Sequence, residues 1–191
     1  GGYLSFALFN AGFHPLLSLP LAMILMFGFG WLVYVIIIRR VIDKDMFTSL
    51  LATFGLSLLM QQVINLIFGP EVQTVDPDFK IYSAFDDFVT IPSIKILSLV
   101  LAALLALGVV LFMKKSRLGQ SIRATAQDPR AARVMGINTD RVYAITFALN
   151  AAICGAAGVL VAMIWVIQPF YGIVYSIRSF AIVTTSGLGN L

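Results

Sequence analysis

The chain has 191 residues, of which 60% are hydrophobic and only 12% are charged, whereas soluble domains carry about 25% charged residues. This composition excludes an ordinary soluble domain and favours an all-α membrane protein, because several apolar runs reach the roughly 20 residues that cross a bilayer as helix. A single cysteine and a single histidine exclude an intrachain disulfide and paired-histidine metal sites. The net charge of +4 comes from basic residues that stand between the apolar runs, which argues against nucleic-acid binding.

Five apolar runs predict a polytopic transmembrane helical bundle. The expected spans cover residues 15–38, 47–68, 94–113, 142–168 and, in part, 180–191. Pro169 is expected to end the fourth span, and residues 170–179, with Gly172 and Arg178, are expected to form a break. We expect a single transmembrane domain over 1–191. We interpret the chain as a fragment lacking both ends, because it starts without methionine and stops within an apolar run.

Two polar segments separate the central spans and predict the orientation. Residues 69–93 hold five acidic residues and one lysine, whereas residues 114–141 hold seven basic and two acidic residues. An excess of Lys and Arg marks the cytoplasmic side of a membrane protein. Residues 114–141 are therefore expected in the cytoplasm, and residues 69–93 in the periplasm.

Polar side chains recur at four-residue spacing in the second span. They are Thr53, Ser57, Gln61 and Asn65, with Gln62 beside them. Four residues turn a helix by about 400°, so these side chains share one slowly drifting face. Polar groups are costly in lipid, and this face should point into the protein. Two interpretations stay open: the face lines a solute pathway, or it hydrogen-bonds a neighbouring helix.

Small residues form a second periodic pattern, in the fourth span. Their spacing of four and three residues predicts a seam along which another helix backbone approaches closely. The seam consists of Ala144, Ala148, Ala151, Gly155, Gly158 and Ala162. We expect these residues to serve helix packing.

The basic segment contains the signals of a short helix outside the membrane. Asp128 suits the N-cap, Pro129 the first helical position, and Gly136 a left-handed terminator. The helix between them would combine Arg130 and Arg133 with too few apolar residues to form a core. It is expected to dock into a groove of a partner protein, or else to lie on anionic lipid headgroups.

No catalytic constellation is visible in the sequence. No nucleophile stands with a base, no set of metal ligands is present, and no Gly-x-x-x-x-Gly-Lys-Ser/Thr stretch could cradle nucleotide phosphates. We therefore expect no catalytic residues, no cofactor and no metal in this chain. Any energy from ATP would come from another subunit.

Two stretches resemble a known family. The first is Leu51-Ala-Thr-Phe-Gly-Leu-Ser-Leu58, followed by Gln61 and Phe68-Gly-Pro70. The second is Gly119-Gln-Ser-Ile-Arg-Ala124, Gln127-Asp-Pro129, Ala131-Ala132 and Met135-Gly-Ile-Asn-Thr-Asp-Arg-Val142, continuing into Thr146-Phe147. They resemble the membrane permeases of bacterial ABC importers for branched-chain amino acids, to which urea-type permeases are closely similar.

The resemblance implies a multi-pass subunit of the bacterial inner membrane that works with several partners. These are a second permease subunit, two cytoplasmic ATPase subunits and a periplasmic solute-binding protein. The family's coupling loop maps onto Asp128, Pro129, Arg130, Ala131, Ala132, Arg133, Met135 and Gly136. The implied function is the import of branched-chain or related amino acids, driven by the separate ATPases. A urea or short-chain amide permease, and a channel or scaffold that needs no ATPase, remain alternatives.

Overall fold

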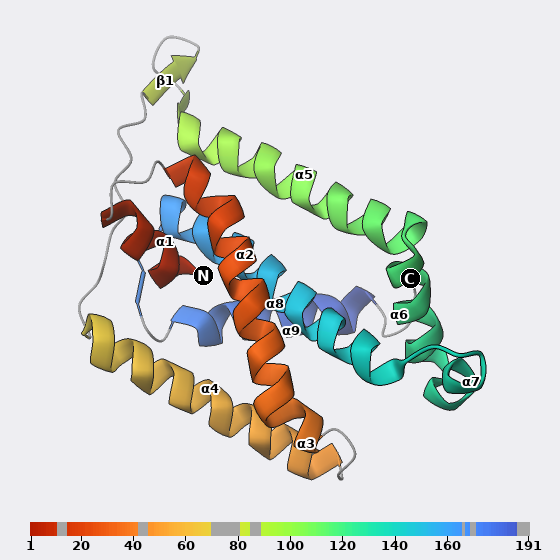
Figure 1. Ribbon diagram of the computed structural model, residues 1–191. Helices are drawn as coiled ribbons and strands as arrows, with labels where there is room; N and C mark the ends of the chain where they lie inside the picture. The colour runs from red at the N-terminus through yellow and green to blue at the C-terminus, as the bar shows by residue number, and fades with distance from the viewer. Residues whose placement is uncertain are drawn as a thin grey trace.

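The computed structural model describes residues 1–10, 15–41, 46–69, 81–84, 89–165, 167–168 and 171–186, and these are almost wholly helical. The first half contains α1 (Gly2–Asn10), α2 (Pro15–Val33), the π-helix η1 (Tyr34–Ile38), α3 (Arg39–Val41) and α4 (Met46–Phe68). The second half contains β1 (Ile81–Ala84), β2 (Val89–Pro92), α5 (Ser93–Lys115), α6 (Arg117–Gln127), α7 (Pro129–Val134), α8 (Thr139–Ile164) and α9 (Tyr171–Ser186) (Figure 1).

Four of the described helices are long and apolar enough to cross a membrane. They are Leu17–Val41, which joins α2, η1 and α3, and then Phe47–Phe68, Lys95–Lys115 and Thr139–Ile164. At about 1.5 Å per residue, each covers the roughly 30 Å hydrocarbon layer. A shorter apolar helix, Gly172–Thr185, lies within α9. The chain is a multi-pass, all-α membrane protein, which confirms the predicted fold class.

The packing centre of the described residues is the pair α2 and α8. Leu19 and Ala22 of α2 form a buried cluster with Val159, Leu160 and Met163 of α8. In Figure 1 the two helices cross at the middle of the molecule, with α4 and α5 on opposite sides of them. A buried hydrogen bond of 3.3 Å between the hydroxyls of Ser5 and Ser18 ties α1 to α2.

The helix that starts with α2 changes its winding before it ends. At the end of η1 the Arg39 N–H donates a hydrogen bond to the carbonyl of Tyr34, five residues earlier. One turn of this wider form is the usual extent of a π-helix inside an α-helix, and such turns are frequent at functional sites. Tyr34 is buried there, and its ring lies 6.3 Å from that of Phe147 in α8.

The fourth span and the break after it differ from the expectation. α8 ends at Ile164, where Trp165 adopts an extended conformation, whereas the span was expected to continue to residue 168. The segment expected as a break is helical from Tyr171 onwards. A proline disfavours helical backbone at the residue before it, here Gln168, and the end of α8 at Ile164, four residues earlier, has no structural explanation. A single glycine or arginine, such as Gly172 or Arg178, does not stop a helix. Residues 187–191 of the expected fifth span lie outside the described residues.

The two polar segments contain more regular structure than their sequences predict. Within residues 69–93, β1 pairs with β2 in antiparallel register, with Ile81 opposite Pro92 and Ala84 opposite Val89. Within residues 114–141 the structure has α6 in addition to the expected short helix. α6 starts at Ser116, whose hydroxyl accepts a hydrogen bond of 2.8 Å from the Gly119 N–H.

Candidate functional site

The small-residue seam of α8 lies against two helices. A side chain added at Gly30 of α2 would overlap Ala151, and one added at Gly155 would lie 2.8 Å from the Met26 side chain. Towards the end of α8 the neighbour changes, since a side chain at Gly158 would lie 2.7 Å from the Gly2 nitrogen of α1. Among the seam residues, Ala144, Ala148, Gly155 and Ala162 are buried, and Ala151 and Gly158 are half-buried.

The polar stripe of α4 is turned to surfaces that the described helices leave open. In the most apolar stretch of α4, none of the residues is buried by the described residues. The Thr53 hydroxyl donates to carbonyls of its own helix, and Ser57 and Gln62 are exposed. Gln61 and Asn65 are half-buried near the end of the helix where Ile64 and Phe68 pack against the cluster of Tyr3, Ala162 and Ile167. Within the part of the chain that the structure describes, the stripe is therefore partly covered at that end and exposed at Thr53, Ser57 and Gln62.

The segment expected to couple to a partner forms α7, a short helix with its own caps. The Asp128 carboxylate accepts hydrogen bonds from the Arg130 and Ala131 N–H groups at 2.8 and 3.1 Å. Gly136 has a φ of +84°, which favours glycine, and it ends the turn. Arg133 Nε donates to the Thr139 hydroxyl at 2.7 Å, which fixes α7 to the start of α8.

One face of α7 is apolar and open to solvent. The Val134 and Met135 side chains are 87% and 81% exposed, whereas Ala132 beside them is buried. The basic Arg130 and the small Ala131 are exposed as well. α7 is therefore a capped short helix that is hydrogen-bonded to the start of α8 and leaves two apolar side chains exposed.

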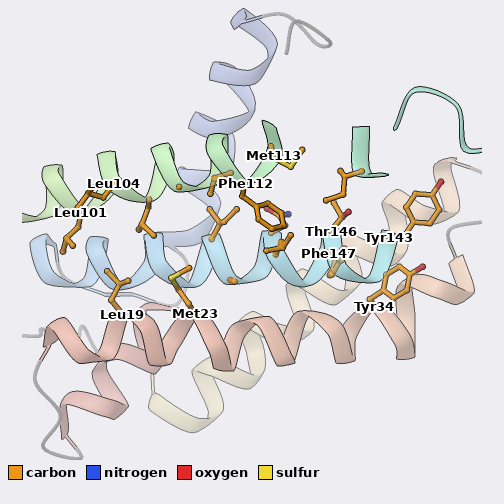
Figure 2. A pocket seen from close by; sticks show the side chains of 18 of the residues that line it. Leu19, Met23, Tyr34, Leu101, Leu104, Phe112, Met113, Tyr143, Thr146 and Phe147 are labelled. Carbon is orange, nitrogen blue, oxygen red and sulfur yellow. The ribbon is translucent and has the colours of Figure 1, made fainter. Parts of the chain in front are cut away.

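An apolar cavity of about 730 Å³ lies between α2, α5 and α8. In Figure 2 Leu19 and Leu101 lie near one end of the cavity, and Tyr34 and Tyr143 near the other. Most of its wall is hydrocarbon, and the lining residues with polar side-chain atoms are Tyr34, Tyr143, Thr146 and Asn150. We name it the inner cavity, because its wall includes Ile122 of α6, which belongs to the basic segment 114–141. Such a wall suits hydrocarbon better than a charged solute.

A second cavity of about 760 Å³ lies on another face of α8. We name it the outer cavity, since its wall comes from the second half of α8, from α9, from the start of α1 and from Ile64 of α4. Like the inner cavity, whose wall includes Tyr34, Tyr143 and Thr146, it is lined in part by residues with hydroxyl groups, here Tyr3, Tyr175, Ser176 and Ser179. The sequence does not reveal this cavity, because its wall combines residues of α1, α4, α8 and α9 that are distant in the chain.

Comparison with known proteins identifies the family. The family model described as the permease component of the branched-chain amino acid transport system matches residues 1–191. The chain belongs to this permease family. The match covers the whole chain and confirms the resemblance seen in residues 51–70 and 119–147. A transport permease family is not a family of enzymes, and no cluster of three His, Cys, Asp or Glu side chains that could hold a metal occurs among the described residues.

Three relatives illustrate the membership of this permease family. The high-affinity branched-chain amino acid permease protein LivH of Salmonella typhimurium is 29% identical over 175 residues, which cover 89% of this chain and 57% of the relative. BraD of Pseudomonas aeruginosa is 28% identical over 205 residues, which cover 100% of this chain and 67% of the relative. A probable LivH of Methanocaldococcus jannaschii is 25% identical over 197 residues, which cover 100% of this chain and 62% of the relative. The chain thus spans somewhat over half the length of the relatives. No solved structure matches it.

Proposed function

We propose that this chain is the transmembrane part of an ABC importer subunit that moves branched-chain or related amino acids across the bacterial inner membrane. The observation that carries the proposal is the family match over residues 1–191, together with relatives whose names state branched-chain amino acid transport. The spanning helices support it, because they supply a membrane domain. The names of the relatives favour amino acids over urea or short amides.

The proposal includes ATPase subunits on separate chains. The 191 residues contain no Gly-x-x-x-x-Gly-Lys-Ser/Thr stretch, so a phosphate-cradling loop of that kind would come from elsewhere. α7 is the contact for these subunits in this proposal. Its support is the capped geometry at Asp128 and Gly136 and the exposure of Val134 and Met135. A ligand shifts a conformational equilibrium only if its affinity differs between the states. In this proposal the ATPase subunits would therefore contact α7 differently in the two states of the transport cycle.

The proposal also includes a second permease subunit and a periplasmic solute-binding protein. The bare surface of α4 supports the former, because polar side chains such as Ser57 and Gln62 are costly next to lipid. In this proposal the stripe of Thr53, Ser57, Gln61, Gln62 and Asn65 lines the solute pathway and is covered by that subunit. Gln61 precedes Ile64 by one helical turn, and Ile64 belongs to the wall of the outer cavity. In this proposal the stripe leads along α4 towards the outer cavity.

Purification and transport test the proposal together. The full-length permease, isolated in mild detergent, is expected to bring down two ATPase chains and a second permease. The reconstituted complex is expected to take up leucine only with ATP and the binding protein. Bulky residues in place of Ala131 and Gly136 should abolish uptake while the protein still inserts into the membrane. Isolation of a lone homo-oligomer, or uptake without ATP, would contradict the proposal.

A further inference from the structure

The inner cavity between α2, α5 and α8 is long and narrow. In Figure 2 its labelled side chains form a row that runs from Leu101 and Leu104 to Tyr143. Leu101 and Met113, twelve positions apart on α5, are separated by about 18 Å at ~1.5 Å per residue. One leaflet is half of the ~30 Å hydrocarbon layer, or about 15 Å. The cavity therefore has the length of a single lipid acyl chain.

Contacts within the chain bound the inner cavity at both ends. At one end Leu101 and Leu105 of α5 pack against the buried cluster of α2 and α8. At the other end α6, whose Ile122 lines the wall, contacts both α5 and α8. This approach is close, because a side chain added at Gly119 would overlap the backbone of α5. A further spanning helix, about 10 Å wide, would run into these contacts, whereas an acyl chain can enter beside Leu104, which is 58% exposed.

The middle of the inner cavity is open space with an apolar wall. Gly108 lines it, and a side chain added there would meet no atom within 4 Å. Apolar cavities exclude water and bind hydrocarbon, and the hydrocarbon beside a spanning helix is lipid. A volume of about 730 Å³ falls within the range of small-molecule sites. The occupant that fits the wall is therefore a lipid chain.

One end of the inner cavity is positively charged. Ile38, Met113 and Ile122 line this end from three different helical segments, and a basic residue directly follows each of them. These basic residues are Arg39, Lys114 and Arg123, all of them exposed. Residues 34–46 and 109–127, which contain this end, carry seven basic and two acidic residues. An anionic headgroup would find its counter-charge at this end of the cavity.

One of these cations is held in place. The Arg123 guanidinium donates a hydrogen bond to the Met113 carbonyl, in the last turn of α5. A guanidinium has five N–H donors, so others stay available for a phosphate, which arginine binds well. Tyr143 lies at the same end (Figure 2). Tyrosine, with its apolar ring and polar hydroxyl, is enriched at the level of lipid headgroups.

From these observations we infer that the inner cavity binds an acyl chain of an anionic phospholipid, in the leaflet on the basic side of the membrane. The phosphate lies near Arg39, Lys114 and Arg123, and the chain runs along α5 towards Leu101. Basic pockets between spanning helices are known to bind anionic headgroups. The bound lipid joins α5 to the pair α2 and α8. This inference uses the membrane fold and the charges, and it does not depend on which solute is transported.

The first test measures headgroup selectivity. The complete transporter is stripped of lipid in detergent and titrated, by native mass spectrometry, with phosphatidylglycerol or with phosphatidylcholine of the same acyl chains. Phosphatidylglycerol should bind at least tenfold more tightly. Arg39→Gln/Lys114→Gln should weaken its binding about 25-fold, because each basic residue at an anionic surface contributes a factor of roughly five.

The matched control for this test removes the same charge elsewhere. Lys95→Gln/Arg178→Gln changes the start of α5 and the middle of α9, and it should keep phosphatidylglycerol affinity within twofold. Equal affinity for the two lipids, or equal loss in the two double variants, would overturn the headgroup site.

The second test fills the cavity. Phosphatidylglycerol at a hundredfold excess over its dissociation constant should raise the melting temperature of the lipid-free wild type by roughly 5 °C. Gly108→Phe places a ring in the open space and should abolish this rise. Gly28→Phe in α2 is the control, because a side chain there also meets no atom within 4 Å but lies outside the described wall of the cavity. The same rise in Gly108→Phe as in the control would contradict the inference.

The third test locates the chain without any substitution. Phosphatidylglycerol with a diazirine at the methyl end of its chain should label residues 101–105 of α5 in the reconstituted transporter. A diazirine next to the glycerol should instead label residues 109–113. Equal labelling of α4, α5 and α9 would indicate ordinary boundary lipid, and absence of label from both α5 and α8 would indicate that another protein segment fills the cavity. Either result would overturn the site.

Discussion

Single glycines decide how closely the two central helices approach. At Gly30 an added side chain would lie 3.2 Å from the Ala148 Cα and the Phe147 carbonyl oxygen, both in the backbone of α8. Backbone atoms cannot rotate away as a side chain can. In a membrane, where lipid is as apolar as the helix surface, such close packing supplies much of the association between helices. Gly30 therefore has a structural role that its sequence context does not reveal.

Gly30→Val tests this contact. We expect a loss of about 1–3 kcal/mol, the usual cost of overpacking, and a correspondingly lower melting temperature in detergent, measured by the temperature dependence of the monodisperse peak in size-exclusion chromatography. Gly28→Val is the matched control, because a side chain at Gly28 would meet nothing within 4 Å. Equal melting temperatures for the two variants would contradict the packing argument.

At the scale of the element, α4 has the most unusual surroundings. Its polar stripe predicts an inward-facing helix, yet the described residues leave most of the helix uncovered. Pathway lining and hydrogen bonding to another subunit differ in one measurable respect, since water reaches a pathway but not a packed helix interface.

Cysteine labelling in the assembled transporter separates these two roles. Ser57→Cys should react with a water-soluble thiol reagent, and leucine with the binding protein should change the rate. The neighbouring Leu58→Cys, off the stripe and facing lipid in this interpretation, should remain unreactive. A protected Ser57→Cys would instead identify the stripe as an interface between helices.

The elements also show which features local sequence determines. The caps of α7 at Asp128 and Gly136 follow from side-chain and backbone preferences within a few residues, and the sequence predicts them. α6 has no apolar run to reveal it; its signals are the Ser116 cap and a periodic set at Leu118, Ile122 and Thr125. The wall of the outer cavity combines residues that are distant in the sequence, such as Tyr3 and those of α9. No local pattern contains that information.

For the whole molecule, the positions of charged residues predict one orientation in the membrane. α6 and α7 belong to the basic segment 114–141, which follows α5, whereas the hairpin of β1 and β2 lies at the other end of α5 (Figure 1). Since α5 spans the membrane by its length, α6 and the hairpin should lie on opposite sides of the bilayer.

Sided labelling measures this arrangement. Engineered Arg117→Cys and Arg133→Cys should react with an impermeant maleimide only in inside-out vesicles, and Ser83→Cys only in sealed right-side-out cells. The native Cys154, which lines the outer cavity, is replaced by alanine as a background control. Reaction of the Arg133→Cys variant from the periplasm would reverse the orientation and remove α7 from the ATPase side.

The glycine and alanine contacts between α2 and α8 also bear on motion. The close approach of the two backbones at Gly30 leaves little room for a sliding movement between α2 and α8, so we expect the pair to move as one rigid body. Hinges must then lie at its margins, for example at the start of α9 or at the turn between α5 and α6. A covalent cross-link placed between α2 and α8 should accordingly leave the transport cycle intact, whereas one between α8 and α9 should arrest it.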